Sequence, residues 1–265
     1  MGILNVTPDS FSDGGKYVGI ERAREHALTM LGQGADLIDI GAESTRPGAK
    51  AVSDETQISR LIPVVNAVID AVGSGPLLSV DTRNPAVAAA ALEAGAVLVN
   101  DVSGASSPHM LPLVAEHDAG IVLMHMQGTP ETMQQQPAYT DVVSEVRSYL
   151  MRRLDAALAA GVNEDRIVID PGIGFGKNRR NNLALLGSLN KFTDLGFPVL
   201  LGTSRKRFMG AICEETVFTE LVGATCATTA LGVAAGVRIF RVHDVKENRQ
   251  AADVAWACAE AALPN

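Results

Sequence analysis

Three side chains that could read a flat heterocycle come directly after runs of valine, isoleucine and leucine: Asp81, Asn100 and Asp170. An unpaired carboxylate beside an apolar wall is costly, so each carboxylate needs polar partners. A carboxylate can accept two parallel N–H bonds from the amidine-like edge of a 2-amino-pyrimidinone ring, and an asparagine amide can match an adjacent donor and acceptor. Any one of these residues could simply cap the next helix. Together they predict a ligand site.

A second set of side chains is cationic and suits a phosphate group. Arg46 lies in a Gly/Pro loop, Lys206 stands between two arginines in "SRKR", and Arg241 precedes His243 by two positions. Residues two apart on a strand point the same way, so we expect Arg241 and His243 to face one ligand together. The alternatives are a solvated basic turn for "SRKR" and a structural histidine at position 243. Lys206 could also donate to the heterocycle.

The opening loop "NVTPDSFSDGG", residues 5–15, could act together with either set, the heterocycle-reading residues or the phosphate-binding cations. Asn5, Asp9 and Asp13 could meet a magnesium–phosphate unit or order a second substrate, because oxygen ligands suit Mg²⁺ rather than zinc. The cysteines share no zinc-type or CxxC spacing, and we expect them to be buried hydrophobes or spare thiols in a reducing cytosol. They are Cys213, Cys226 and Cys258.

The stretch "DPGIGFGK", residues 170–177, resembles a phosphate-binding loop only superficially. Pro171 stands where the P-loop pattern requires its first glycine, and Asn178 stands where the pattern requires Ser or Thr. The three glycines are evenly spaced, so the dinucleotide pattern fails as well. The chemistry of this stretch therefore centres on Asp170.

The elements that must position these residues are eight short apolar runs, each followed by a turn and then a helical pattern. The runs lie at residues 2–5, 36–41, 77–81, 96–101, 120–125, 166–170, 197–202 and 237–243. Continuous apolar runs are typical of parallel strands buried on both faces. Eight strand–helix units without a linker predict an α/β fold, a (β/α)₈ TIM barrel forming one domain over residues 1–265, with the site where the strands end. A doubly wound open sheet is the alternative, and the polar stretch 126–138 is a mobile flap or simply a loop.

Composition narrows the classes of partner. The formal net charge of −8 argues against general nucleic-acid or anionic-membrane binding, and the apolar fraction of 47% permits a substantial core. No apolar run approaches the length of a membrane span, and no signal peptide opens the chain. We therefore expect a cytoplasmic enzyme that acts on small molecules.

Eight motifs occur together and in order: "GILNVTPDSFSDGG", "DIGAESTRPGA", "SVDT", "NDVSG", "MHMQG", "DPGIGFGK", "GTSRKRF" and "RVHDV". Over nearly all of its length the chain closely resembles bacterial dihydropteroate synthases. The resemblance implies a (β/α)₈ barrel that condenses 6-hydroxymethyl-7,8-dihydropterin pyrophosphate with p-aminobenzoate, giving 7,8-dihydropteroate and pyrophosphate for folate biosynthesis. It also implies an S_N1-like route with Mg²⁺-pyrophosphate as leaving group, sulfonamides as competitors of p-aminobenzoate, and a homodimer through helices near the C-terminus.

The resemblance implies a role for each matching residue. Those that hold the pterin are Asp81, Asn100, Met124, Asp170, Gly202 and Lys206. Those around the pyrophosphate are Asn5, which is also the metal ligand, Arg46, Arg241 and His243. Those that shape the p-aminobenzoate site are Thr45, Pro47, Phe175, Lys206 and Arg207. The loop that closes over the site carries Asp9, Phe11 and Asp13. The residues expected to carry catalysis are Lys206, Asp81, Arg241 and Asp13.

The chain departs from the family pattern in two places. Arg207 stands where some relatives have a serine that touches the p-aminobenzoate carboxylate; it could pair with that carboxylate or point away, and a sulfonamide-resistance-associated or environmental synthase is one interpretation. The chain begins inside the first strand motif, so either the start is trimmed or this member lacks the segment that closes the barrel bottom. Two rival functions are a folate-binding methyltransferase domain and a non-catalytic pterin-binding paralogue.

Overall fold

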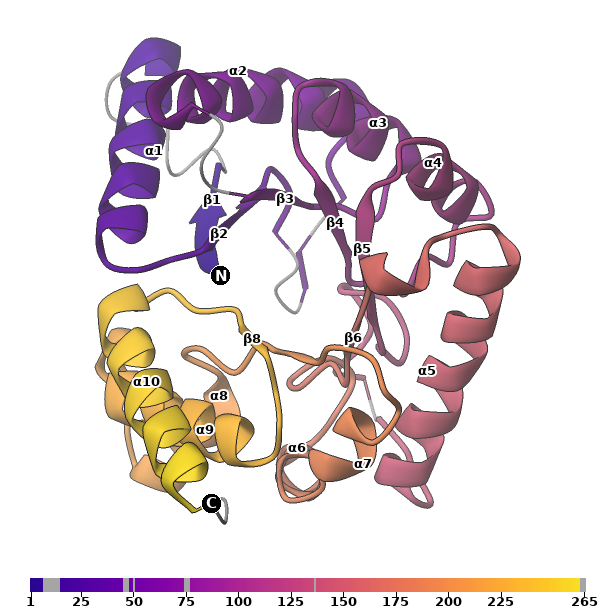
Figure 1. The fold of residues 1–265 in the computed structure, drawn as a ribbon, viewed down its shortest axis with the longest axis vertical. Helices are drawn as coiled ribbons and strands as arrows, with labels where there is room; N and C mark the ends of the chain where they lie inside the picture. The colour runs from indigo at the N-terminus through magenta and orange to yellow at the C-terminus, as the bar shows by residue number, and fades with distance from the viewer. Residues whose placement is uncertain (7–14, 45–47, 50, 74–76, 136, 263–265) are drawn as a thin grey trace.

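The computed structural model describes residues 1–6, 15–44, 48–49, 51–73, 77–135 and 137–262, with the backbone alone for 15–18. Within these residues, eight parallel strands alternate with helices, and the helices run in order around the outside of the strands (Figure 1). The predicted (β/α)₈ barrel is confirmed. Its strands are β1 (Gly2–Asn5), β2 (Leu37–Gly41), β3 (Leu77–Asp81), β4 (Leu98–Asp101), β5 (Gly120–Met124), β6 (Ile167–Asp170), β7 (Leu200–Leu201) and β8 (Ile239–Phe240).

The ring of strands closes through two short parallel contacts. Strands β1 to β6 pair in sequence order, and β7 pairs with β8. The bridge Ile169–Val199 joins the first group to the second, and the bridge Gly2–Val242 joins β8 back to β1. The backbone N–H of Ile3 donates to the carbonyl of Val242 at 3.0 Å. The open doubly wound sheet is therefore excluded, because both of its edges would lack such a partner.

The helices start at sequence signals that satisfy their first N–H groups. Asn84 accepts from the N–H of Ala86 and is followed by Pro85 at the first helical position, and Asp141 accepts from two N–H groups of the helix it precedes. Among the described helices, none combines the length and apolarity needed to cross a bilayer. They are α1 (Gly15–Gly32), α2 (Asp54–Val72), α3 (Pro85–Glu93), α4 (Met110–Glu116), α5 (Val142–Ala159), α6 (Arg179–Leu186), α7 (Asn190–Thr193), α8 (Arg207–Cys213), α9 (Val222–Ala234) and α10 (Val245–Ala261).

The strands divide their side chains between two cores. Side chains such as Ile38, Val99 and Ile121 pack outward against the helices in the main core. Alternate side chains point into the barrel, because the side-chain period of a strand is two. At the amino ends of the strands they form an apolar cluster, called here the lower layer, which comprises Met1, Leu37, Leu98, Val122, Val168, Leu200 and Ile239. This layer fills the barrel beneath the strand ends that carry the predicted site.

Candidate active site

Four of the predicted pterin-binding residues lie at the carboxyl ends of four neighbouring strands: three are the last residue of their strand, and Asn100 is the last but one of β4. Asp81 lies opposite Asn100 in the register of β3 and β4, and Met124 lies opposite Asp170 in the register of β5 and β6. All four side chains are buried. The carboxyl ends of the barrel strands therefore gather the predicted heterocycle-reading residues on one rim.

A carboxylate that sequence reasoning missed lies at the centre of this rim. Asp39 is fully buried, and its Oδ2 accepts from Nε of Arg241 at 2.6 Å and from Nδ2 of Asn100 at 2.9 Å. Arg241 also donates from Nη2 to Oδ2 of Asp81 at 2.8 Å. Arg241, predicted for pyrophosphate, is thus held by two carboxylates. Oδ1 of Asp39 and Oδ1 of Asp81 are buried and have no hydrogen-bond partner within the described part of the chain, so the rim offers acceptors for a ligand's N–H groups.

Burial raises the pKa values of both predicted pterin-binding carboxyl groups, Asp81 and Asp170. Burial raises the pKa of Asp81 to about 7, the charge of Arg241 opposes this, and neighbouring carboxylates such as Asp39 add to it. Burial likewise raises the pKa of Asp170 to about 6. Two contacts oppose this shift: the N–H of Gly172, which donates to Oδ1 of Asp170 at 2.7 Å, and the positive charge of Lys206. Ionised carboxylates held at such a cost are typical of functional sites.

Lys206 and Phe175, both predicted for the p-aminobenzoate site, are in contact. Nζ of Lys206 donates to the carbonyl of Ile173 at 2.7 Å and lies 4.1 Å from the centre of the Phe175 ring. Burial lowers the pKa of Lys206 to about 8, with Asp170 opposing the shift. Gly174 has a φ of +84°, and a Cβ there would lie 2.8 Å from Cδ of Lys206. The glycine therefore makes room for the lysine.

The three consecutive cations of "SRKR" do not form one cluster. Arg205 pairs with Asp244 through two hydrogen bonds of 2.5 and 3.0 Å. Arg207 is exposed, and its guanidinium lies 5.9 Å from the Phe218 ring. Of these three cations, Lys206 is the one that contacts the loop after β6, through its amine.

The remaining described residues of the predicted site lie at the ends of β1, β7 and β8. His243 donates its backbone N–H to Oγ of Ser204 at 3.1 Å, and its Nδ1 lies 2.9 Å from the same oxygen. Gly202 follows β7, and a Cβ at this position would meet open space. Asn5 ends β1 with an exposed side chain opposite Gly41 of β2.

Six predicted site residues lie outside the described residues, so their placement stays a prediction. They are Asp9, Phe11, Asp13, Thr45, Arg46 and Pro47.

Among the described residues near the strand ends, the buried polar residues that sequence reasoning missed include Asp39, Lys177 and Ser204. Asp39 carried a usable signal, because a charged residue inside the apolar run 36–41 needs a buried partner. Lys177 ends a glycine-rich stretch, and no pattern in the sequence assigns it a partner. Its burial depends on contacts with the end of β5, which no local pattern reveals.

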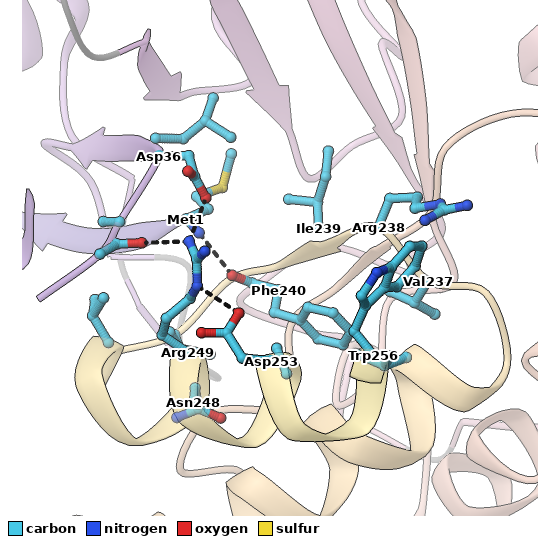
Figure 2. A pocket seen from close by; sticks show the side chains of 17 residues that line it. Met1, Asp36, Val237, Arg238, Ile239, Phe240, Asn248, Arg249, Asp253 and Trp256 are labelled. Atoms are coloured by element: carbon cyan, nitrogen blue, oxygen red, sulfur yellow. Dashed lines mark hydrogen bonds and ion pairs between the residues drawn. The ribbon is translucent and has the colours of Figure 1, made fainter. Parts of the chain in front are cut away.

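A pocket of about 250 Å³ lies at the opposite, amino end of the barrel, between β8, α10 and the start of β2 (Figure 2). None of the described site residues lines it. Arg249 pairs there with Asp253 at 2.8 Å, and the Arg238 guanidinium lies 4.7 Å from the centre of the Trp256 ring. The first contact lies within α10, whereas the second, together with the pairing of Arg249 with Asp36 at 3.6 Å, ties α10 to the barrel. These contacts place no reactive group opposite another.

Comparisons with known proteins point to one family. A family model described as "Pterin binding enzyme" matches residues 1–243. The dihydropteroate synthase of Bacillus subtilis is 48% identical over 248 residues, which is 93% of this chain and 84% of that protein. The dihydropteroate synthase of Escherichia coli K12 is 43% identical over 257 residues, covering 97% of this chain and 90% of that protein.

Solved structures agree with these relatives. The Yersinia pestis dihydropteroate synthase, crystallised with a sulfonamide drug complex, superposes with a TM-score of 0.91 at 40% identity and covers 98% of this chain and 94% of that chain. The Xanthomonas albilineans dihydropteroate synthase in complex with 7,8-dihydropteroate gives a TM-score of 0.87 at 40% identity and covers 100% and 94% of the two chains.

Proposed function

The chain belongs to the pterin-binding enzyme family, and from that premise we infer that it catalyses the dihydropteroate synthase reaction. It condenses 6-hydroxymethyl-7,8-dihydropterin pyrophosphate with p-aminobenzoate, giving 7,8-dihydropteroate and pyrophosphate for folate biosynthesis. The observation that carries the inference is the meeting of Asp81, Asn100 and Asp170 on one rim of the barrel, within reach of the charges of Arg241 and Lys206.

The pterin is assigned to the carboxylate side of the rim. The 2-amino-pyrimidinone edge of a pterin presents adjacent N–H donors, which match an ionised Asp170. The unpartnered buried oxygens of Asp39 and Asp81 support this assignment, since each would gain a hydrogen bond when donors arrive. Met124, buried between the same strand ends, provides an apolar contact for the face of the ring.

The p-aminobenzoate is assigned to the side of Lys206 and Phe175. In the proposed reaction, the C–O bond between the pterin methylene and the pyrophosphate breaks first, and the pterin ring delocalises the resulting positive charge. The arylamine nitrogen then forms the C–N bond and loses a proton to water. No enzyme nucleophile takes part, so positioning of the two substrates accounts for much of the rate.

The leaving pyrophosphate is assigned to Asn5, Arg46, Arg241 and His243, of which Arg46 lies outside the described residues. Within the described residues, no cluster of three His, Cys, Asp or Glu side chains could hold a metal by itself. The exposed amide of Asn5 still fits Mg²⁺, because this ion keeps several waters and needs few protein oxygens when substrate phosphates also bind it. Bound Mg²⁺ would stabilise the negative charge that develops on the pyrophosphate.

Sulfonamides are proposed to compete with p-aminobenzoate, as the sulfonamide complex of the Yersinia pestis relative suggests. The homodimer also stays a prediction, supported by the exposed side chains of Leu231 on α9 and of Val254 and Trp256 on α10. The cytoplasmic location likewise stays a prediction.

Turnover by the purified chain tests the proposed function. The dihydropterin pyrophosphate, p-aminobenzoate and Mg²⁺ are mixed with the protein, and pyrophosphate and dihydropteroate are followed together, with and without a sulfonamide. Equal release of both products supports the synthase. Folded protein that binds pterin and forms neither product would favour the non-catalytic paralogue, and tight binding of methyl-tetrahydrofolate without turnover would favour the methyltransferase domain.

A further inference from the structure

Lys177 is a buried lysine to which the proposed reaction assigns no role. Its side chain is 2% exposed, and its Nζ lies among four acceptors. It donates to the carbonyls of Gly172 and Phe175 at 2.9 Å each and to the carbonyl of His125 at 3.2 Å, and it lies 2.9 Å from Nδ1 of His125. The Lys177 amine thus links two carbonyl groups of the loop that follows β6 to His125, the residue after β5.

The imidazole of His125 takes part as an acceptor. Burial lowers the pKa of His125 to about 3, and the charge of Lys177 adds to this effect, so the ring is neutral at physiological pH. Nδ1 therefore accepts from the lysine, and the ring proton resides on Nε2. Burial also lowers the pKa of Lys177 to about 7, with Asp170 opposing the shift. All four partners are acceptors, an arrangement that favours the ammonium form.

The loop that Lys177 holds has little stiffness of its own. Its glycines at 172, 174 and 176 all have positive φ angles. A Cβ on Gly172 would lie 1.9 Å from the carbonyl oxygen of His125, and a Cβ on Gly176 would lie 2.5 Å from that of Gln127. The loop therefore packs directly against the backbone after β5, and glycine makes this approach possible at the cost of rigidity.

The same loop presents the groups that hold Lys206. The two carbonyls bound by Lys177, those of Gly172 and Phe175, lie on either side of Ile173, whose carbonyl accepts from Lys206. The Phe175 ring lies 4.1 Å from the Lys206 amine. A shift of the loop would therefore move both side chains assigned to the p-aminobenzoate side of the site.

We propose that Lys177 is a positioning residue for the synthase reaction: its amine ties the 170–177 loop to the end of β5 and thereby sets the positions of Phe175 and Lys206. The proposal rests on the proposed function. Lys177 contacts neither substrate in this scheme. It acts through the loop backbone, so its loss affects p-aminobenzoate more than the pterin, which Asp81 and Asn100 also hold from other strands.

The first test replaces Lys177 by Met, which keeps the length of the side chain and removes its donors. The matched control is Lys191→Met on the exposed surface of α7. Folding is checked by thermal melting. For folded Lys177→Met we expect kcat/KM for p-aminobenzoate to fall about 10- to 100-fold, with a much smaller change in KM for the pterin pyrophosphate. The control variant keeps wild-type values.

The second test uses chemical rescue and keeps the proposal falsifiable if Lys177→Met does not fold. Lys177→Ala leaves a space that matches n-propylammonium, and 1-propanol is the uncharged comparison. We expect n-propylamine to restore stability and p-aminobenzoate turnover in a saturable way and propanol not to. If both compounds restore activity equally, or if neither does, the proposal that the Lys177 ammonium positions the loop is wrong.

The wild-type chain is measured first, so that the two ideas fail separately. A wild-type chain that forms no dihydropteroate counts against the proposed function. A wild-type chain and a Lys177→Met variant of equal activity overturn the positioning role alone.

Discussion

The two ends of the barrel interior are built from the same strands and differ in chemistry. At the amino end, the lower layer is apolar, whereas at the carboxyl end buried carboxylates, an amide and an arginine contact one another. The change occurs over two residues on four strands, β2, β4, β6 and β8, in the pairs Leu37 and Asp39, Leu98 and Asn100, Val168 and Asp170, and Ile239 and Arg241. One step of the strand period thus separates a packing position from a ligand position.

This difference indicates a division of labour between the two layers. The carboxyl end keeps charges out of water, and the raised pKa values of Asp81 and Asp170 show that burial disfavours their ionised forms. The side chains of the lower layer are apolar and contribute buried apolar surface. We infer that the lower layer stabilises the barrel while the carboxyl end reduces its stability in exchange for binding, as functional sites commonly do.

The largest expected effect is on stability, at the lower layer. Leu200 is fully buried there, and Leu200→Ala should reduce the free energy of unfolding by about 2–5 kcal/mol, because it removes packed methyl groups and leaves a cavity. Chemical denaturation measures the change. Activity per folded molecule should stay near that of the wild type.

The control is Leu183→Ala on α6, where the side chain is 42% exposed. We expect a change of less than about 0.5 kcal/mol at that position. If Leu200→Ala changed substrate KM values while stability stayed constant, the separation of the two layers would be wrong.

Asp170→Asn should have effects opposite to those of Leu200→Ala: activity should fall and stability should not. Replacing an acceptor by a donor that faces the pterin N–H groups should lower kcat/KM about 100-fold or more. Stability should rise. The folded-state pKa of about 6 exceeds the ordinary 3.8, so the stability linked to this group is present below pH 3.8 and is lost as the pH rises through 6. At pH 8 the variant should gain up to about 3 kcal/mol, and the gain should vanish toward pH 4.

Denaturation at the two pH values, with steady-state kinetics alongside, measures both effects. A variant that is less stable than the wild type at pH 8 would show that the Asp170 carboxylate contributes to the fold rather than weakening it.

The contrast between the layers also explains what the sequence could predict. The eight strands were found because each is a continuous apolar run, and Asp81, Asn100 and Asp170 were found because each ends such a run. Their partners were harder to find, because Asp39 meets Arg241 across 202 positions of the chain. Local sequence patterns predict where a strand lies and which side chains share a face. The Asp39–Arg241 ion pair forms only because the barrel closes.

The same limit applies to the cations. Arg205 looked like part of a basic cluster, and its pairing with Asp244 depends on how the loops after β7 and β8 meet. Lys177 ends the stretch "DPGIGFGK", and its burial depends on the approach of that loop to His125. Residue type predicted which side chains could do chemistry, and tertiary contact decides which of them remain available for a ligand.

Asp39→Asn should produce a moderate effect that is specific to the carboxyl end. In the wild type, kcat/KM for the pterin substrate should fall below about pH 7 as Asp81 and Asp170 take up protons, and above about pH 8 as Lys206 loses its proton. Burial is the main cause of the raised pKa of Asp81, and the negative charge of Asp39 adds to it, so removing that charge should move the acid limb to lower pH. A pH–rate profile measures this shift, and an acid limb that moves upward would contradict the charge coupling.

The smallest effect is expected for Arg207→Ala, at the outer edge of the carboxyl end. The guanidinium is exposed and lies near the Phe218 ring, so it is less constrained than Lys206 beside it. An exposed ion pair contributes up to about 1 kcal/mol, so a contact with the p-aminobenzoate carboxylate would change KM by no more than about fivefold. Steady-state kinetics and sulfonamide inhibition measure it, with Arg180→Ala on the exposed surface of α6 as control. A loss of tenfold or more would mean that Arg207 turns toward the substrate and belongs to the site as firmly as Lys206 does.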